Sequence, residues 1–236
     1  MKIRIDLKIF IFAIIFLLTK QIRIYGILML FALIHECGHL LVGIILKFKP
    51  LKLEIMPYGL SIDFKVECND YNKKIKKRTM LSLKKMLIAF AGPFTNLIIV
   101  LVFIMFNINL FGIERELVIY SNILIGLFNL IPIYPLDGGR ILKELLHFFI
   151  GLEKSDKYTN ATSKITIFLL TFLSSIIILY IRNIAIIIIL SYLWYIVLKE
   201  DRRYYNREKI RSVYNHIKSN NEVSNLNYWH INAFVR

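Results

Sequence analysis

Long apolar runs separated by short polar segments organise this chain and predict its main elements. A helix needs about 20 mainly apolar residues to cross roughly 30 Å of hydrocarbon, and several runs approach or reach that length. We expect helical spans at Leu7–Thr19, Ile24–Leu46, Met86–Phe106, Leu117–Leu136, Ile165–Ile181 and Ile184–Leu198. The predicted fold class is therefore an all-α polytopic membrane protein with about six transmembrane helices.

The segment between the second and third runs has a different pattern. Apolar and polar residues alternate from Lys52 to Glu67 on both sides of Pro57-Tyr58-Gly59, which predicts a short membrane-surface β-hairpin. Its edge strand could pair with an extended substrate, or the segment could rest as an amphipathic loop on lipid headgroups. Residues 1–198 would then form the membrane domain, and residues 199–236 a basic cytosolic tail.

Composition and charge support a membrane location. Hydrophobic residues make up 57% of the 236 residues and the mean hydropathy is +0.58, which is too apolar for an ordinary soluble domain. With a cytosolic N-terminus, 27 of the 31 Lys and Arg residues fall on the cytosolic side, as the positive-inside rule requires. We expect a multi-pass protein of a bacterial cell membrane with both termini in the cytosol. A basic face against the anionic lipid bilayer then explains the net charge of +15, and no nucleic-acid partner is expected.

A cluster of ionisable residues interrupts the second apolar run. His35-Glu36-Cys37-Gly38-His39 lies in a segment that carries no other charge between Arg23 and Lys47. Residues four apart share one face of a helix, so His35 and His39 can present two imidazoles to one Zn²⁺ ion. Glu36 lies next to the first histidine, where a general base can take a proton from a water activated by the metal. A structural histidine pair is the alternative, but unpaired burial of these groups would be costly.

A third ligand is expected from a proline-rich segment after the fourth run. Asp137 is the remaining carboxylate at the edge of an apolar run, and it follows Pro132 and Pro135, which break the helix. Irregular backbone at membrane depth is tolerated where it lines a site rather than faces lipid. As an alternative, Asp137 could be the N-cap of a helix over residues 138–150.

Three motifs together resemble the site-2 protease family of intramembrane zinc metalloproteases. They are the His35–His39 motif, Gly92-Pro93-Phe94-Thr95-Asn96 and the Asn129–Gly138 segment, in the order found in the family. The resemblance implies Zn²⁺ on His35, His39 and Asp137, with Glu36 as the base. It also implies that Asn129 and Asn96 hydrogen-bond the substrate backbone or steady the site. From the residues alone, Asn129 could instead brace the proline-broken backbone, and Asn96 could tie the second and third spans together.

The lengths of the connecting segments indicate which branch of the family this chain resembles. The segment between the second and third spans is too short for a PDZ domain, and the residues after 198 are too few for paired CBS modules. The compact sporulation branch remains, although it has the CBS tail that is missing here, which places nucleotide regulation in doubt. That branch implies a membrane-tethered pro-sigma factor as substrate, membrane-protein inhibitors as candidate partners and a location in the mother-cell membrane around the forespore. A metal transporter and a catalytically silent scaffold are the rival functions.

Overall fold

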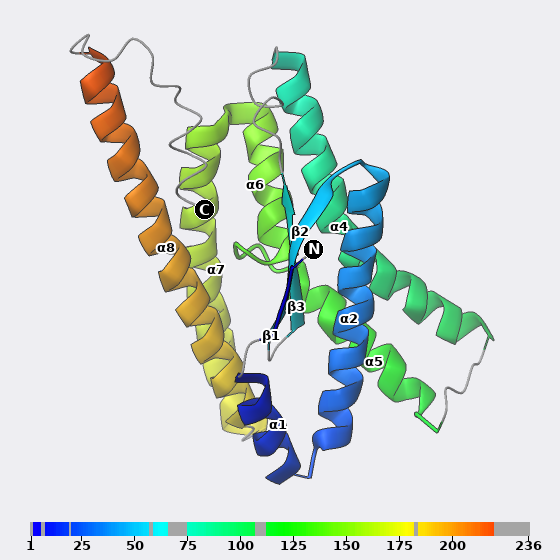
Figure 1. Cartoon of the computed structure of the whole chain (residues 1–236). Coiled ribbons are helices and arrows are strands. Elements are labelled where there is room, and N and C mark those ends of the chain that lie inside the picture. The colour runs from blue at the N-terminus through cyan, green and yellow to red at the C-terminus, as the bar shows by residue number, and fades with distance from the viewer. Residues whose placement is uncertain are drawn as a thin grey trace. The chain divides into compact units, whose positions relative to one another are not determined.

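A computed structural model describes residues 2–5, 8–18, 20–56, 59–65, 75–106, 112–181 and 184–219. The chain divides into two compact units (Figure 1). The first consists of Met1–Glu67 and Met80–Ile131, and the second of Cys68–Thr79 and Pro132–Arg236.

The first unit contains most of the apolar helices. They are α1 (Lys8–Leu18), α2 (Ile22–Ile45), α4 (Ile75–Phe106) and α5 (Arg115–Asn129). Side chains of α2, α4 and α5 form a shared core of Ile27, Phe31, Phe103 and Val118. Many large apolar side chains point outward from these helices, which is expected where lipid rather than water surrounds a protein. Within the described chain, Ile22–Ile45 and Met80–Phe106 are long and apolar enough to cross a membrane.

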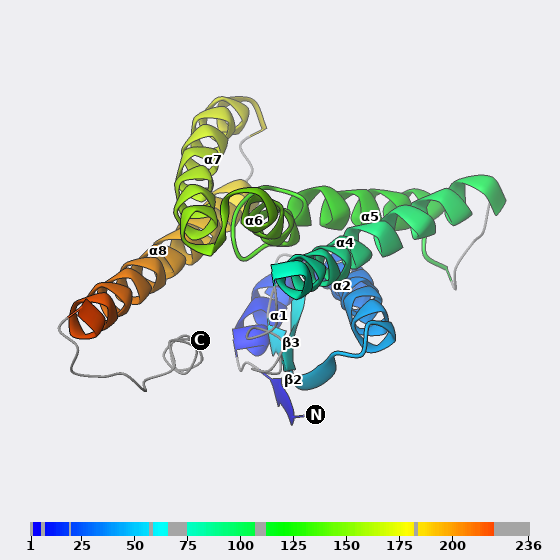
Figure 2. The ribbon, with the colours of Figure 1, turned by 90° about the horizontal axis from the view of Figure 1, so that it is seen from above.

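A three-stranded sheet packs beside α2 in both views (Figures 1 and 2). Strand β2 (Lys49–Met56) is in the middle, with β3 (Gly59–Lys65) antiparallel and β1 (Lys2–Ile5) parallel to it. In the pairing of β2 with β3, Leu53 lies opposite Ile62. The parallel β1 strand was not predicted, and the turn residues 57–58 lie outside the described chain. The position of the sheet at a membrane surface stays a prediction.

The second unit is built from α6 (Asp137–Ile150), α7 (Leu152–Ile181) and α8 (Ile184–Ser219). Helices α7 and α8 run antiparallel, because contacts between them join progressively earlier residues of one to later residues of the other. Trp194 donates to Thr171 at 3.0 Å, Lys164 pairs with Asp201 at 2.7 Å, and Arg211 pairs with Asp156 at 2.9 Å. The apolar half of each helix therefore lies beside the apolar half of the other, and polar half lies beside polar half.

Each predicted span falls on a helix, but several helix ends differ from the prediction. The expected Leu117–Leu136 span ends at Asn129, because the prolines that follow lack the backbone N–H that would continue the helix. Helix α7 begins at Leu152 rather than Ile165, and α8 continues to Ser219 through the predicted tail boundary. The hydropathy pattern predicts only the apolar halves of α7 and α8. Their polar halves are also helical, and ion pairs between the two helices hold them together. Membrane crossing by the other four predicted spans stays a prediction.

Candidate metal centre

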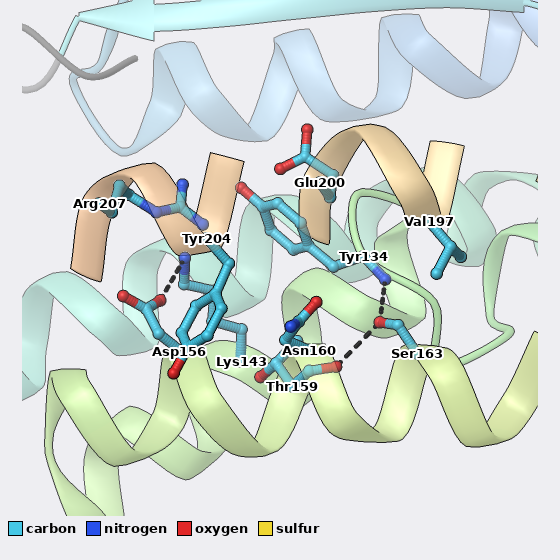
Figure 3. Close-up of a pocket in the computed structure, with 10 residues that line it drawn as sticks. All are labelled: Tyr134, Lys143, Asp156, Thr159, Asn160, Ser163, Val197, Glu200, Tyr204 and Arg207. Carbon is cyan, nitrogen blue, oxygen red and sulfur yellow. Dashed lines mark hydrogen bonds and ion pairs between the residues drawn. The ribbon is translucent and has the colours of Figure 1, made fainter. Parts of the chain in front are cut away.

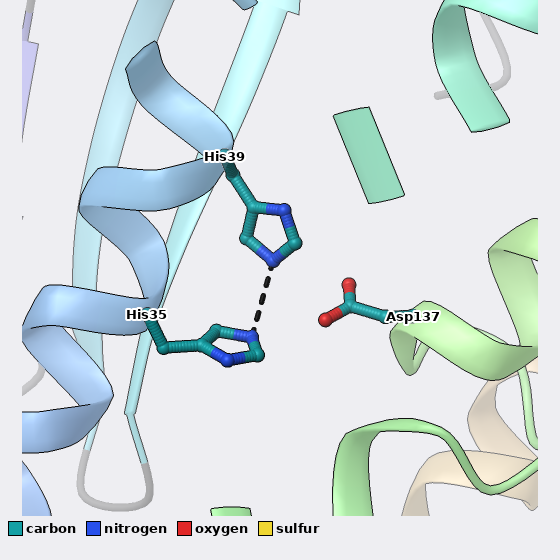
Figure 4. A group of neighbouring side chains, drawn as sticks. All are labelled: His35, His39 and Asp137. Atoms are coloured by element: carbon teal, nitrogen blue, oxygen red, sulfur yellow. Dashed lines mark hydrogen bonds between the residues drawn. The ribbon is translucent and has the colours of Figure 1, made fainter. Parts of the chain in front are cut away.

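Two histidines of α2 face each other in the interior of the first unit. His35 and His39 are 2% and 3% exposed, and their Nε2 atoms lie 3.2 Å apart (Figure 4). The four-residue spacing places both rings on one face of the helix, where they meet edge to face at 84°. Two imidazole nitrogens that converge in a buried place need a shared proton or a cation between them. The pair thus has the arrangement of two ligands for one metal ion.

A hydrogen bond fixes the orientation of the His39 ring. Its Nδ1 lies 2.6 Å from the backbone carbonyl oxygen of Ile88 in α4. A carbonyl oxygen only accepts hydrogen bonds, so Nδ1 carries the proton and donates it. The Nε2 lone pair is then available to a metal, which is the usual arrangement of a metal-binding histidine and its backbone partner.

Glycines allow α4 to lie close to the two rings. A Cβ atom on Gly92 would lie 2.4 Å from His39 Nε2 and 2.5 Å from His35 Nε2, closer than real Cβ contacts. A Cβ on Gly38 of α2 would in turn lie 2.2 Å from Thr95 Oγ1. Small residues at a crossing let two helices pack closely inside a membrane. In the sequence, Gly92 stands out only as part of a motif, and no local signal predicts its contact with the histidines.

The carboxylate of Asp137 is held at the start of α6. The structure places the N-cap at Leu136 and makes Asp137 the first helical residue, so the alternative role of Asp137 as N-cap is wrong. The segment before it is braced, because Tyr134 N–H donates to Ser163 Oγ at 3.0 Å. Gly139 lies directly against the backbone of Ile133, with no room for a side chain. Asp137 is 5% exposed, so its carboxylate needs a cationic or hydrogen-bonding partner.

His35, His39 and Asp137 form a group that could hold a metal ion. One ligand atom from each lies within 4.8 Å of the others (Figure 4). Two imidazole nitrogens with one carboxylate oxygen are a donor set that suits zinc, with a fourth position left for water or substrate. The residues present therefore fit a catalytic zinc ion. Glu36 follows His35 on α2 and is half-buried.

The two predicted asparagines differ in their surroundings. Asn129 donates from Nδ2 to the carbonyl oxygen of Ile125, one turn earlier in α5, at 3.0 Å. Asn96 is 1% exposed, and neither of its amide atoms has a hydrogen-bond partner within the described chain. The alternative that Asn96 ties α2 to α4 by a hydrogen bond is therefore wrong. A Cβ on Gly126 would lie 3.6 Å from Asn96 Cβ, so this side chain faces α5 instead.

Comparisons with known proteins found a matching family profile and several similar proteins. A profile described as Peptidase family M50 matches residues 115–173. A zinc metalloprotease of Methanocaldococcus jannaschii is 33% identical over 57% of this chain and 37% of its own length. Stage IV sporulation protein FB of Bacillus subtilis is 24% identical over 69% of this chain and 54% of its own length. The chain thus spans between about a third and about half of these curated relatives.

A solved structure supports the same fold. The site-2 protease from Methanocaldococcus jannaschii superposes with a TM-score of 0.61 at 23% identity, covering 84% of this chain and 89% of that one. At this identity the likeness establishes the fold alone. The order of helices found here is therefore a known architecture.

Proposed function

We propose that this chain is a member of the site-2 protease family of peptidase M50 and an intramembrane zinc metalloprotease, as its similarities to known proteins support. The observation that carries this proposal is the buried group of His35, His39 and Asp137, which offers three zinc ligands. Glu36 stands next to the first of them as the general base. Peptide hydrolysis requires both the ligands and the base, whereas a transporter or a silent scaffold would not need this complete set.

Each side chain of the site would have its own role in peptide hydrolysis. His35, His39 and Asp137 would hold the ion, and a zinc ion bound there supplies a Lewis acid and a water that ionises near neutral pH. Glu36 accepts a proton from the attacking water and passes it to the leaving amine. The carbonyl of Ile88 keeps the proton of His39 on Nδ1, so that Nε2 faces the ion.

Asn96 and Asn129 are proposed to hold the substrate backbone. An amide side chain offers a donor and an acceptor, which is what an extended peptide group needs. The amide of Asn96 is buried without a hydrogen-bond partner in the described chain, and leaving it so would cost about 1–3 kcal/mol. Asn129 lies in the last turn of α5, before the segment that leads to Asp137. Both positions therefore have amide groups that an unfolded substrate segment could use.

The substrate is inferred to be a membrane-associated pro-sigma factor in a sporulating bacterium. The similarity to stage IV sporulation protein FB supports this choice. A multi-pass membrane location with cytosolic termini is supported by the apolar helices and by the placement of basic residues. The similarity to stage IV sporulation protein FB supports the mother-cell membrane as that location. The lipid bilayer and membrane-protein inhibitors are the other proposed partners.

Co-expression with membrane-tethered transcription-factor precursors tests this function. We expect the wild-type chain to shorten one precursor, detected as a size shift on a gel. Glu36→Gln should retain zinc but lose cleavage by a factor of about 10³ or more, since it removes the general base and leaves the ligands in place. Full cleavage by this variant would refute the assignment of the base. Zinc uptake into vesicles without cleavage of any precursor would favour a transporter.

A further inference from the structure

A small polar cavity lies among α6, α7 and α8 of the second unit (Figure 3). Its volume is about 20 Å³, which is room for one or two water-sized groups. Charged and hydroxyl side chains line most of it: Lys143, Asp156, Thr159, Glu200, Tyr204 and Arg207. Neither the metal centre nor its mechanism uses these residues.

The cavity lies where the apolar halves of α7 and α8 end. Its lining includes Ser163 and Val197, which border the apolar runs of the two helices. Three exposed tyrosines lie on α7 and α8 close to the point where the apolar halves end: Tyr158, Tyr195 and Tyr205. Tyrosine side chains gather at the headgroup layer of membranes, where an apolar ring and a polar tip are both accommodated. This end of the second unit is therefore placed at the depth of the lipid headgroups.

One of the cations around the cavity has no ion-pair partner in the described part of the chain. Asp156 pairs with Lys143 at 2.8 Å and with Arg211 at 2.9 Å. Arg211 also binds Glu208, and Glu200 binds Arg203. Arg207, by contrast, forms no ion pair or hydrogen bond with another residue in the described part of the chain, and its Nε is enclosed without an acceptor.

A second polar group facing the cavity also lacks a partner. Thr159 is 3% exposed, and its Oγ1 has no hydrogen-bond partner among the described residues. A hydroxyl and a guanidinium that line one cavity can both donate to an acceptor placed between them. A water molecule would satisfy the hydroxyl but would bring no negative charge to Arg207, whose electrostatic partner Asp156 is already paired with Lys143 and Arg211.

Lys143 adds a second positive charge to the cavity. Burial lowers the pKa of Lys143, but Tyr134 and Asp156 outweigh this effect and the pKa is raised overall. The lysine therefore remains protonated at neutral pH. The positive charge at the cavity persists under the conditions in which a membrane enzyme works.

We propose that this cavity binds the phosphate group of a membrane phospholipid. Arg207 and Lys143 supply the positive charge, and Thr159 donates a hydrogen bond from its hydroxyl. One or two phosphate oxygens fit the volume, while the rest of the lipid stays at the membrane surface. The carboxylates of Asp156 and Glu200 also line the cavity, but each is paired with another cation. Anionic lipid is therefore expected to bind better than zwitterionic lipid, because Arg207 has no ion pair of its own in the described chain.

Lipid binding to the purified full-length chain in detergent tests this proposal. Native mass spectrometry with phosphatidylglycerol should show binding by the wild type that falls about tenfold in Arg207→Gln, which loses a charge-assisted contact. Arg202→Gln is the matched control, since it removes the same charge from an exposed position of the same helix. Zinc content should be unchanged in both variants, so a failure of the lipid site is separate from a failure of the metalloprotease function.

Two further measurements complete the test. Thr159→Val changes no charge and should weaken phosphatidylglycerol binding about threefold, which tests the cavity if Arg207→Gln fails to fold. Titration with inorganic phosphate separates the two sources of a phosphate group. Equal lipid binding by Arg207→Gln and Arg202→Gln would overturn the site. Binding of inorganic phosphate that depends on Arg207, with no preference for phosphatidylglycerol over phosphatidylcholine, would overturn the lipid as its source.

Discussion

Gly92 of α4 lies directly against the two imidazole rings of α2, so its lack of a side chain matters for metal binding. Gly92→Ala should push the rings apart or turn them, and we expect zinc content to fall about tenfold or more, as happens when the surroundings of metal ligands are disturbed. Zinc analysis of the purified variant by mass spectrometry measures this loss.

Gly26→Ala is the matched control for this prediction. Gly26 is also helical, but nothing lies within 4 Å of the Cβ it would gain. We expect full zinc content and slightly greater stability, because alanine has the higher helix propensity. Gly38→Ala pushes α2 against Thr95 without touching the rings, so it separates a general helix displacement from the direct clash. Normal zinc content in Gly92→Ala would show that the ring contact is not needed.

At the residue scale, the sequence predicted which residues form the candidate metal group, but not their surroundings. His35 and His39 were predicted because a four-residue spacing within an apolar run has few other physical explanations. The contacts of these rings with Ile88 and Gly92 could not be predicted, because they depend on where α4 crosses α2. The lack of a hydrogen-bond partner for Asn96 has the same origin, since nothing in the local pattern says which helix an amide will face.

At the element scale, the edge strand β3 connects the sheet to the helix that carries the histidines. A Cβ on Gly43, one turn beyond His39 in α2, would lie 2.4 Å from the ring of Phe64 in β3. If β3 pairs with an extended substrate, Phe64→Pro should abolish cleavage while zinc stays bound, because proline removes a backbone donor from the edge. Cleavage of the precursor and zinc content are measured on the same preparation.

Two other substitutions at this position separate pairing from packing. Phe64→Leu keeps the backbone N–H and an apolar contact with α2, so it should retain most cleavage. Phe64→Ala keeps the N–H but loses the ring packing against Gly43. If Phe64→Ala is as inactive as Phe64→Pro, then packing rather than strand pairing explains the loss.

Element boundaries show where pattern and structure differ. The antiparallel pairing of β2 with β3 follows from alternation around a turn, whereas β1 joins the sheet from the other end of the sequence. A four-residue strand of this kind has no local signal that distinguishes it from a basic N-terminal segment. The polar halves of α7 and α8 were read as loop and tail, although pairs such as Arg211 with Asp156 hold them together as helices.

At the scale of the whole molecule, charge decides which way the chain lies in a membrane. Basic residues are concentrated in the segments that the prediction places in the cytosol, and moving them to the other side would oppose the positive-inside rule. The second unit is consistent with this orientation. Contacts such as Lys164 with Asp201 bring the polar halves of α7 and α8 together, so both would lie on the same side of a membrane crossed by their apolar halves.

Cysteine labelling in intact cells tests this orientation. In a Cys37→Ser, Cys68→Ser background, Gln21→Cys places a thiol between the first two predicted spans, and Ser212→Cys places one in the polar half of α8. Both positions are exposed to solvent in the structure. A membrane-impermeant maleimide should label Gln21→Cys but should label Ser212→Cys only after the cells are opened, because a cytosolic thiol is shielded by the membrane. Labelling of Ser212→Cys in intact cells would reverse the orientation, and it would move the proposed phosphate site to the outer leaflet.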